Sequence, residues 1–356
     1  MSVAADRPEN LRMIRDSAGA VVPPGDLRRV RALRFGAPGI DRDVWREMCA
    51  MGWPGLRLPE AEGGSGLGMA EFCALVEELG RGLVPEPLIQ GAFAARLLRG
   101  EALEALLAGE RIVLPAWQER AGAIAAGRDA ALRDGRVTGR KLFVPMASCA
   151  DAFLVTTHDG LALVRADAPG VSLEIAGTQD GGHFGTLSLD DAPAEAVAAA
   201  TEDAVDEALD EAALALAAYL LGAMERSFAL TLDYLCTRRQ FGRPIGSFQA
   251  LQHRAADLGI QIALTRASVE SAAATLDSAG PAAPRAAAVS RAKARAATAS
   301  MLVTRQAIQL HGAIGYTDEA DIGLYLRKAM VLANLHGSAA EHRARYARLL
   351  PETDHD

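Results

Sequence analysis

Apolar residues in the first third of the chain recur at the three- and four-residue spacing of an α-helix. One such set, which marks a single helical face, comprises Val44, Trp45, Met48, Cys49 and Met51. Side chains at this spacing lie on one side of a helix, so the pattern indicates helices that bury that side. Proline and glycine interrupt the pattern at residues 23–25 and 52–55. We therefore expect an N-terminal α-helical domain over residues 1–107.

Short extended runs replace the helical spacing over residues 111–198. The apolar runs lie at 112–117, 141–145, 152–156 and 161–164, with turn residues such as Arg133-Asp134-Gly135 between them. Short apolar runs between turn signals are typical of antiparallel β structure. The sequence therefore predicts a middle antiparallel β domain over residues 108–200.

Long helical runs rich in alanine and leucine return after residue 201. In the second of them, Leu258, Ile262 and Val269 share one face. Small alanine side chains allow helices to approach closely, as in an antiparallel four-helix bundle. We expect a C-terminal four-helix bundle over residues 201–356, and an α+β fold class for the whole chain. The wide apolar faces also favour burial against other subunits; the alternative is that a bundle within one chain covers them.

Composition narrows the function classes. The 356 residues carry a formal net charge of −8 with basic residues spread along the chain, which disfavours nucleic acid as a partner. The start of the chain has no apolar core of signal-peptide length, and no later run approaches about 20 uncharged apolar residues. This pattern predicts a soluble, cytoplasmic protein with no membrane partner. Four widely separated cysteines without zinc-ligand spacing predict core thiols, with neither a metal site nor a disulfide framework.

The connection between the first two long C-terminal helices carries the strongest candidate chemistry. Residues 238–252 read Arg-Arg-Gln-Phe-Gly-Arg-Pro-Ile-Gly-Ser-Phe-Gln-Ala-Leu-Gln, in which Gly242 and Pro244 mark a turn. Arg238 and Arg239 place two guanidinium groups beside an aromatic ring, which suits phosphate contact and stacking on a planar ligand. A phosphate-bearing cofactor is one interpretation, and an ordinary helix connection with solvated arginines is the other.

The same stretch resembles the Arg-x-x-Phe-Gly-x-Pro-Ile-x-x-Phe-Gln signature of the acyl-CoA dehydrogenase family. Residues 309–316, Gln-Leu-His-Gly-Ala-Ile-Gly-Tyr, are similar to a second family segment, and residues 59–67 and 76–82 resemble the family's N-terminal domain. The resemblance implies a flavoprotein that binds FAD and an acyl-CoA and introduces an α,β double bond. It also implies a homo- or hetero-oligomer, either dimer or tetramer, and an acceptor similar to electron-transfer flavoprotein.

Eight positions correspond to cofactor contacts in the resemblance. Residues 238–241 would meet the diphosphate and adenosine side of FAD, and the loop at 309–313 would approach from another subunit. In the β domain an aromatic residue would flank the flavin ring, and near the C-terminus a serine would offer it a hydroxyl. These positions are Arg238, Gln240, Phe241, Gln309, Gly312, Ala313, Phe143 and Ser338.

Three departures from the family pattern affect the expected cofactor contacts. Pro145 stands where a threonine would offer a hydroxyl and a backbone N–H to the flavin. Residues 114–122 do not match the Thr-Glu-Pro-x-Ala-Gly-Ser-Asp loop that touches flavin and thioester, and Ala313 replaces a glycine. The resemblance therefore supports cofactor contacts from the β domain less than those from the helices.

The family's catalytic base is a glutamate near the C-terminus, and His336 occupies that position here. A neutral imidazole, with an unperturbed pKa of about 6.5, can accept a proton; the alternative is a polar histidine without a catalytic role. Some family members place the base on the first bundle helix, where Glu211 lies one residue from the expected position, Ala212. One residue turns a helical side chain by about 100°, so a carboxylate that stabilises a helix start is the simpler interpretation of Glu211.

Three functions are open at this point. The first is FAD-dependent dehydrogenation of an acyl-CoA. The second is a base-deficient subunit that completes the FAD site of a homologous partner in a heteromer, which the departures at Pro145 and His336 favour. Such mixed assemblies resemble those that act on bulky steroid-side-chain thioesters. The third is a flavin oxidase or monooxygenase that uses a different base.

Overall fold

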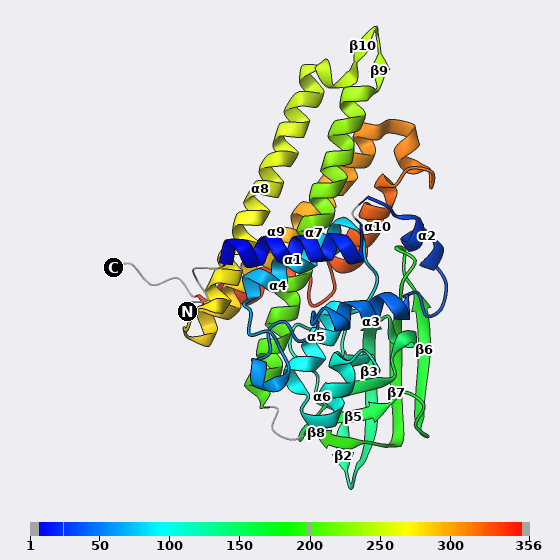
Figure 1. Ribbon diagram of the computed structural model, residues 1–356, viewed down its shortest axis with the longest axis vertical. Helices are drawn as coiled ribbons and strands as arrows, with labels where there is room; N and C mark the ends of the chain where they lie inside the picture. The colour runs from blue at the N-terminus through cyan, green and yellow to red at the C-terminus, as the bar shows by residue number, and fades with distance from the viewer. Residues whose placement is uncertain (1–6, 24, 198–200, 351–356) are drawn as a thin grey trace. The chain divides into compact units, whose positions relative to one another are not determined.

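The computed structural model describes residues 7–23, 25–197 and 201–350 (Figure 1). Contacts divide the chain into two units. The helical unit takes the described residues up to 27, those from 69 to 84 and those from 213 onward. The mixed unit takes those from 28 to 68 and from 85 to 212. The domain boundaries expected at residues 107 and 200 remain predictions.

Three long helices form the frame of the helical unit: α7 (Glu202–Thr237), α8 (Gln249–Asp277) and α9 (Ala282–His311). Two shorter helices, α10 (Ile322–Leu332) and α11 (Ala339–Leu349), both pack on α9. The core shared by α7, α8 and α9 includes Leu221, Met224, Leu258, Ile262, Ala299 and Val303. The predicted C-terminal helical domain is confirmed, and its fourth helix is broken into α10 and α11.

Two helices from the first part of the chain, α1 (Arg7–Val21) and α4 (Met69–Arg81), complete the helical unit. α4 crosses α7 at a pair of glycines. A β-carbon added to Gly80 would overlap the backbone of Tyr219, and one added to Gly222 would overlap the backbone of α4 in the same way. Glycine at both positions therefore permits a close helix crossing that any side chain would block.

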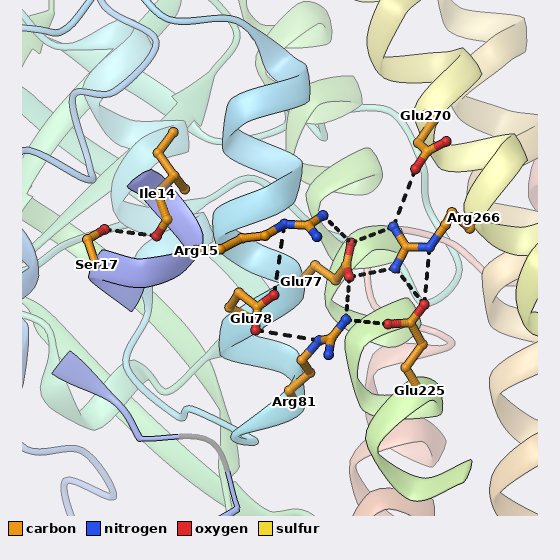
Figure 2. Close-up of polar contacts among 9 residues, drawn as sticks. All are labelled: Ile14, Arg15, Ser17, Glu77, Glu78, Arg81, Glu225, Arg266 and Glu270. Carbon is orange, nitrogen blue, oxygen red and sulfur yellow. Dashed lines mark hydrogen bonds and ion pairs between the residues drawn. The ribbon is translucent and has the colours of Figure 1, made fainter. Parts of the chain in front are cut away.

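Figure 2 shows a cluster of arginines and glutamates that joins α1, α4, α7 and α8. The buried carboxylate of Glu77 accepts hydrogen bonds from Arg266 at 2.6 and 3.1 Å and from Arg81 at 2.9 Å. Glu225 accepts from both arginines at 2.5 Å. Burial alone would raise the pKa of Glu77, but the guanidiniums of Arg266 and Arg15 hold this pKa below its usual value. The cluster therefore stays charged and fastens the two N-terminal helices to the bundle.

In the described residues of the mixed unit, the β structure consists of two four-stranded sheets. One sheet has the order β1-β4-β5-β8, with β1 at Val113–Ala116, β4 at Ala152–Thr157, β5 at Gly160–Arg165 and β8 at Glu195–Val197. The other has the order β2-β3-β7-β6, with β2 at Ala131–Arg133, β3 at Arg136–Pro145, β7 at His183–Pro193 and β6 at Val171–Gly177.

Neighbouring strands are antiparallel except β1 and β4, which run parallel. The chain between β1 and β4 forms β2 and β3 of the other sheet, and a connection of that length allows the parallel pairing. The predicted antiparallel β domain is therefore confirmed apart from this one pair.

The helices of the mixed unit are α2 (Arg28–Leu33), α3 (Arg42–Ala50), α5 (Leu88–Leu97) and α6 (Gly100–Leu107). Trp45 of α3 lies in the core of the two sheets, and Gly91 of α5 leaves room for its ring. Met51 is exposed although the spacing places it on the buried face of α3, because the helix ends at Ala50.

Among the described residues, α7 is long and apolar enough to cross a membrane by length and composition alone, but most of its apolar stretch is buried inside the protein. The core helix of a bundle has the same composition. Cys49, Cys73 and Cys149 are buried, whereas Cys236 is exposed. The prediction of a core position is therefore wrong for Cys236, which lies in the last turn of α7, where the neighbouring Leu235 faces the core instead.

Candidate functional site

The predicted turn between α7 and α8 is a β-hairpin at the end of the two helices (Figure 1). β9 (Arg239–Gln240) pairs with β10 (Arg243–Pro244), and the turn residues Phe241 and Gly242 have φ of 52° and 79°. Positive φ at both central residues is the signature of the type I′ turn, whose twist matches that of the paired strands. The hairpin is therefore a tight two-residue turn with a defined geometry.

The side chains of this hairpin offer hydrogen-bond donors and an aromatic ring to the outside. Phe241 is 90% exposed, and Arg238 and Gln240 are also exposed. Within the described part of the chain, the side chains of Arg238 and Gln240 form no hydrogen bond or ion pair. The guanidinium of Arg243 lies 4.1 Å from the centre of the Phe248 ring. This donor set fits a planar, phosphate-bearing ligand.

Three of the predicted site residues share an unusual backbone conformation. Phe143, Phe241 and His336 have φ of 56°, 52° and 55°, in the left-handed region that residues with a β-carbon rarely adopt. Among the described residues other than glycine, eight have a positive φ. Such strain costs about 1–3 kcal/mol per residue, persists only where the surroundings enforce it, and clusters at functional sites. Since the type I′ turn accounts for the φ of Phe241, the backbone strain favours Phe143 and His336 as functional positions.

The second predicted cofactor segment lies at the end of α9. Gln309 is in the last turn, and the 3-10 helix η4 (Gly312–Tyr316) follows directly. Gly312 ends α9 with φ of 68°, and a β-carbon added there would meet no atom within 4 Å. Gln309 and Ala313 are both exposed. The methyl group of Ala313 therefore does not disturb the fold, and its effect falls on whatever approaches this surface from outside.

Phe143 lies on β3 of the mixed unit, where the pairing with β7 shifts register between Lys141 and Val144. A register shift of this kind turns a side chain out of the regular pleat. The Phe143 ring meets the Phe184 ring edge to face, with centroids 6.2 Å apart, and 39% of Phe143 is exposed. Pro145 ends β3 and has neither a hydroxyl nor an N–H to offer. Phe143 can present its ring to a ligand. The hydroxyl and backbone N–H that a threonine would offer at position 145 are missing.

His336 lies in the turn between α10 and α11 and is only 5% exposed. Its carbonyl oxygen is 2.8 Å from Nε2 of His342. The fully buried ammonium of Lys293, on α9, donates to the carbonyl oxygens of Ala333 and Gly337, both at 3.0 Å, and to a third carbonyl at the end of α10 at 3.3 Å. A single side chain of α9 therefore holds the turn that carries His336.

Burial lowers the pKa of His336 to about 3, and the neighbouring Lys293 and His342 act in the same direction. Burial also lowers the pKa of Lys293 to about 7, against the pull of Glu341, while its three carbonyl partners favour the ammonium form. A general base works best when its pKa lies near the operating pH. In this arrangement His336 is therefore a poor acceptor for a substrate proton.

Lys293 is a residue that the sequence-based predictions missed. A signal for it was present, because Lys293 stands at four-residue spacing between Val289 and Ala297 on the buried face of α9. A charged group on such a face must be paired or fully hydrogen-bonded. The sequence alone does not say which partners satisfy it, since they lie in a turn much later in the chain.

Ser338 is the N-cap of α11. Its Oγ accepts a hydrogen bond from the Glu341 N–H at 3.4 Å, and the Glu341 carboxylate accepts one from the Ser338 N–H at 2.6 Å, which together form a capping box. A hydroxyl can accept and donate at once, so the cap leaves the hydroxyl hydrogen for another partner. The expected contact between Ser338 and the flavin is compatible with this geometry and remains a prediction.

Glu211 lies in the part of α7 that belongs to the mixed unit, and it is buried. Its carboxylate forms ion pairs with Arg57 and with Arg96, the latter at 3.2 Å. Because α7 begins at Glu202, Glu211 is not in its first turn, and the interpretation as a helix-start carboxylate is wrong. Both oxygens are engaged in structural ion pairs, and a catalytic role for Glu211 remains a prediction.

Comparison with known proteins identifies the family to which the chain belongs. The model of the acyl-CoA dehydrogenase N-terminal domain matches residues 8–99, and the model of the C-terminal domain matches residues 203–350. The acyl-CoA dehydrogenase IpdE2 of Mycolicibacterium smegmatis is 33% identical over 345 residues, which cover 95% of this chain and 97% of the relative. The chain belongs to the acyl-CoA dehydrogenase family.

Two solved structures support the same fold over nearly the whole chain. The Tcur3481-Tcur3483 steroid ACAD has a TM-score of 0.85 and 33% identity, and the alignment covers 96% of this chain and 98% of the other. The ChsE4-ChsE5 complex from Mycobacterium tuberculosis has a TM-score of 0.84 and 29% identity, with 99% and 98% covered. The predicted acyl-CoA dehydrogenase fold, with N-terminal helices, a middle β region and a C-terminal helical domain, is confirmed. As a member of the acyl-CoA dehydrogenase family, the protein is a flavoprotein oxidoreductase.

Proposed function

We propose that this chain is a base-deficient subunit of a heteromeric acyl-CoA dehydrogenase and that it holds FAD together with a homologous partner. The environment of His336 carries the proposal. At the position of the family's carboxylate lies a buried imidazole, next to an ammonium group. Removing the weakly acidic α-proton of an acyl thioester requires a base with a suitable pKa that can reach it. The partner chain supplies that base.

The helical unit fits FAD by the chemistry of its side chains. Arg238 and Gln240 offer donors to a diphosphate, and the exposed ring of Phe241 offers a stacking surface. Gln309 offers an exposed amide beside the open backbone at Gly312. When bound, FAD supplies the acceptor for the hydride that leaves the β-carbon. The residues proposed to hold it are Arg238, Gln240, Phe241, Gln309, Gly312, Ala313, Phe143 and Ser338.

The names of two relatives support a mixed assembly. Both the Tcur3481-Tcur3483 steroid ACAD and the ChsE4-ChsE5 complex are named for pairs of chains, and one name specifies a steroid enzyme. We extend this to the present chain as a dimer or tetramer of two different subunits. Its substrate is a bulky steroid-derived acyl-CoA that gains an α,β double bond, and its electrons pass to an acceptor similar to electron-transfer flavoprotein. A cytoplasmic location remains the prediction made from the sequence.

Autonomous dehydrogenation, with His336 as the base, is the second candidate function. One observation favours it, because His336 has the strained backbone that is common at functional sites. For this function the turn must open, so that the imidazole moves away from Lys293 and reaches the substrate.

Visible absorbance separates the two functions. The chain is purified alone and together with a homologous acyl-CoA dehydrogenase chain, and an acyl-CoA is added without oxygen. We expect no bleaching by the chain alone, and a yellow complex that bleaches. Replacing the base of the partner should abolish bleaching, whereas His336→Asn in this chain should leave it. A chain that is yellow alone and bleaches with acyl-CoA overturns the proposal in favour of autonomous activity.

A further inference from the structure

A pair of stacked rings lies at the ends of the two helices that lead into the segments proposed to contact FAD. The Tyr234 ring, in the last turn of α7, stacks on the His311 ring at the end of α9, with centroids 4.5 Å apart and planes 21° from parallel. The hairpin region at 238–246 begins one turn after Tyr234, and η4, at 312–316, begins immediately after His311. The stack therefore joins the two helices at the points where both segments leave them.

We infer that Tyr234 and His311 are a positioning pair, which holds the hairpin and η4 at a fixed separation so that both contact one diphosphate-bearing ligand. The inference rests on the proposed function, in which these segments bind FAD. It also changes the expected arrangement, since two segments joined within one chain reach the same ligand together, whereas the resemblance implied that the second approaches from another subunit.

The stack is coupled to both segments through the backbone. The Arg238 N–H donates to the carbonyl oxygen of Tyr234 at 2.9 Å, and the Ile245 N–H donates to the carbonyl oxygen of Arg238 at 2.8 Å, which closes the hairpin. At the end of α9, the Gly312 N–H bonds back to the carbonyl oxygen of Gln309. A displacement of either ring therefore reaches the cofactor segments through helix-end hydrogen bonds.

Contacts on α7 and α9 next to the stack fix its geometry. One turn earlier, Leu230 of α7 packs against Ala307 and Ile308 of α9. Nδ1 of His311 is 2.8 Å from the carbonyl oxygen of Ala307. A carbonyl oxygen only accepts, so Nδ1 carries the hydrogen and the helix itself orients the ring. The stacking contact depends on two flat rings, so another aromatic residue can take the place of either one.

Amide hydrogen exchange tests the inference without FAD. In Tyr234→Ala, exchange should rise together in residues 238–246 and 312–316, and stay unchanged near the middle of α7. Tyr234→Phe keeps the ring and should exchange like the parent. Tyr346→Ala removes a tyrosine of α11 outside the stack and serves as the matched control. A rise confined to one segment, or no rise in either, overturns the coupling.

FAD titration of the flavin-binding assembly gives the second readout. The affinity for FAD should fall about threefold to tenfold in Tyr234→Ala and in His311→Ala, with no further loss when both are combined, because each removes the same stack. His311→Phe should restore the parent affinity. Equal affinity in all variants overturns the positioning role and leaves the proposed function intact. A parent that binds no FAD in any assembly overturns the proposed function itself, and with it the role of the stack toward FAD.

Discussion

The hairpin at residues 239–244 and the turn at residues 334–338 belong to the same helical unit but use their polar groups in opposite ways. In the hairpin, Phe241 is 90% exposed and the side chain of Arg238 faces outward. In the turn, His336 is 5% exposed. Lys293 of α9 donates three hydrogen bonds to backbone carbonyl oxygens of the turn and of the end of α10. The hairpin is open to a ligand, and the turn is closed by bonds within the protein.

Ligand binding and proton transfer make different demands on a site. Binding a diphosphate needs donors that are bonded only to water until the ligand arrives, as at Arg238. Proton transfer needs a base that reaches the substrate and has a pKa near the working pH, and His336 meets neither condition. The difference indicates a chain that keeps the cofactor side of an acyl-CoA dehydrogenase and leaves proton removal to another subunit.

Removing the Lys293 ammonium should have the largest effect, because it opens the closed turn. In Lys293→Met, three buried carbonyl oxygens lose their donor, and unsatisfied buried acceptors cost about 1–3 kcal/mol each. We expect the free energy of unfolding, measured with urea, to fall by on the order of 4 kcal/mol. Lys328→Met on α10 is the matched control and should cost less than about 1 kcal/mol. An equal loss in both variants would show that the ammonium does not hold the turn.

Acid should lower the free energy of unfolding through two buried histidines, His336 in the turn and His342 on α11. An imidazole in the unfolded chain has a pKa of about 6.5. In the folded chain, burial lowers the pKa of His336 to about 3 and that of His342 to about 4. Between these values the unfolded state binds more protons, so the stability is complete above the unfolded pKa and is lost as the pH falls toward the folded values. From about pH 6.5 to about pH 5 we expect the free energy of unfolding to fall by about 2–3 kcal/mol.

The charged groups that face these histidines define the control for the pH dependence. Lys293 and Arg345 lower the pKa of His342, and Glu341 raises it. Lys293, with a pKa of about 7, is mostly charged at about pH 6.5 and almost fully charged at about pH 5, so most of the slope belongs to the histidines. His336→Asn should remove about half of the slope. Identical slopes in parent and variant would contradict the burial of His336 as an uncharged ring.

The sequence predicts the chain reversal at the hairpin better than the turn at residues 334–338, because the information for the reversal is local. Gly242 and Pro244 determine the chain reversal, and the outward side chains follow from it. The turn is held by hydrogen bonds from Lys293, which lies on α9. The residues next to His336 in the sequence therefore do not predict that the turn is closed. The stack of Tyr234 on His311 is likewise a contact between distant helices.

The same distinction separates the predicted elements of the fold from the missed ones. The long bundle helices follow from their apolar spacing. β6 and β7 were not predicted, because neither contains a continuous apolar run. No position of β6 is buried, and buried positions alternate with less buried ones along most of β7. The parallel pairing of β1 with β4 was missed because it depends on the path of the chain through the second sheet.

Removing the Arg238 guanidinium should weaken FAD binding at the hairpin and leave the stability of the fold unchanged. Arg238→Ala deletes an exposed guanidinium with no structural partner in the described residues, so the fold should keep its stability. A hydrogen bond to a charged group contributes about 1.5–3 kcal/mol, and solvent exposure reduces this, so we expect about a tenfold loss in FAD affinity. Fluorescence titration with FAD measures it, and Arg12→Ala on α1 is the surface control. Unchanged FAD affinity would remove the hairpin from the cofactor site.

The smallest effect is expected from His336→Asn in the flavin-binding complex. Asparagine tolerates the left-handed backbone at this position and has no basic nitrogen, so it tests proton transfer without adding backbone strain. We expect the rate of anaerobic bleaching by an acyl-CoA to change by less than about threefold, since loss of a working general base costs about a hundredfold or more. His253→Asn, on the exposed side of α8, controls for the loss of a histidine elsewhere. A hundredfold decrease in His336→Asn alone would mean that the turn opens during turnover, and His336 would then be the base of an autonomous enzyme.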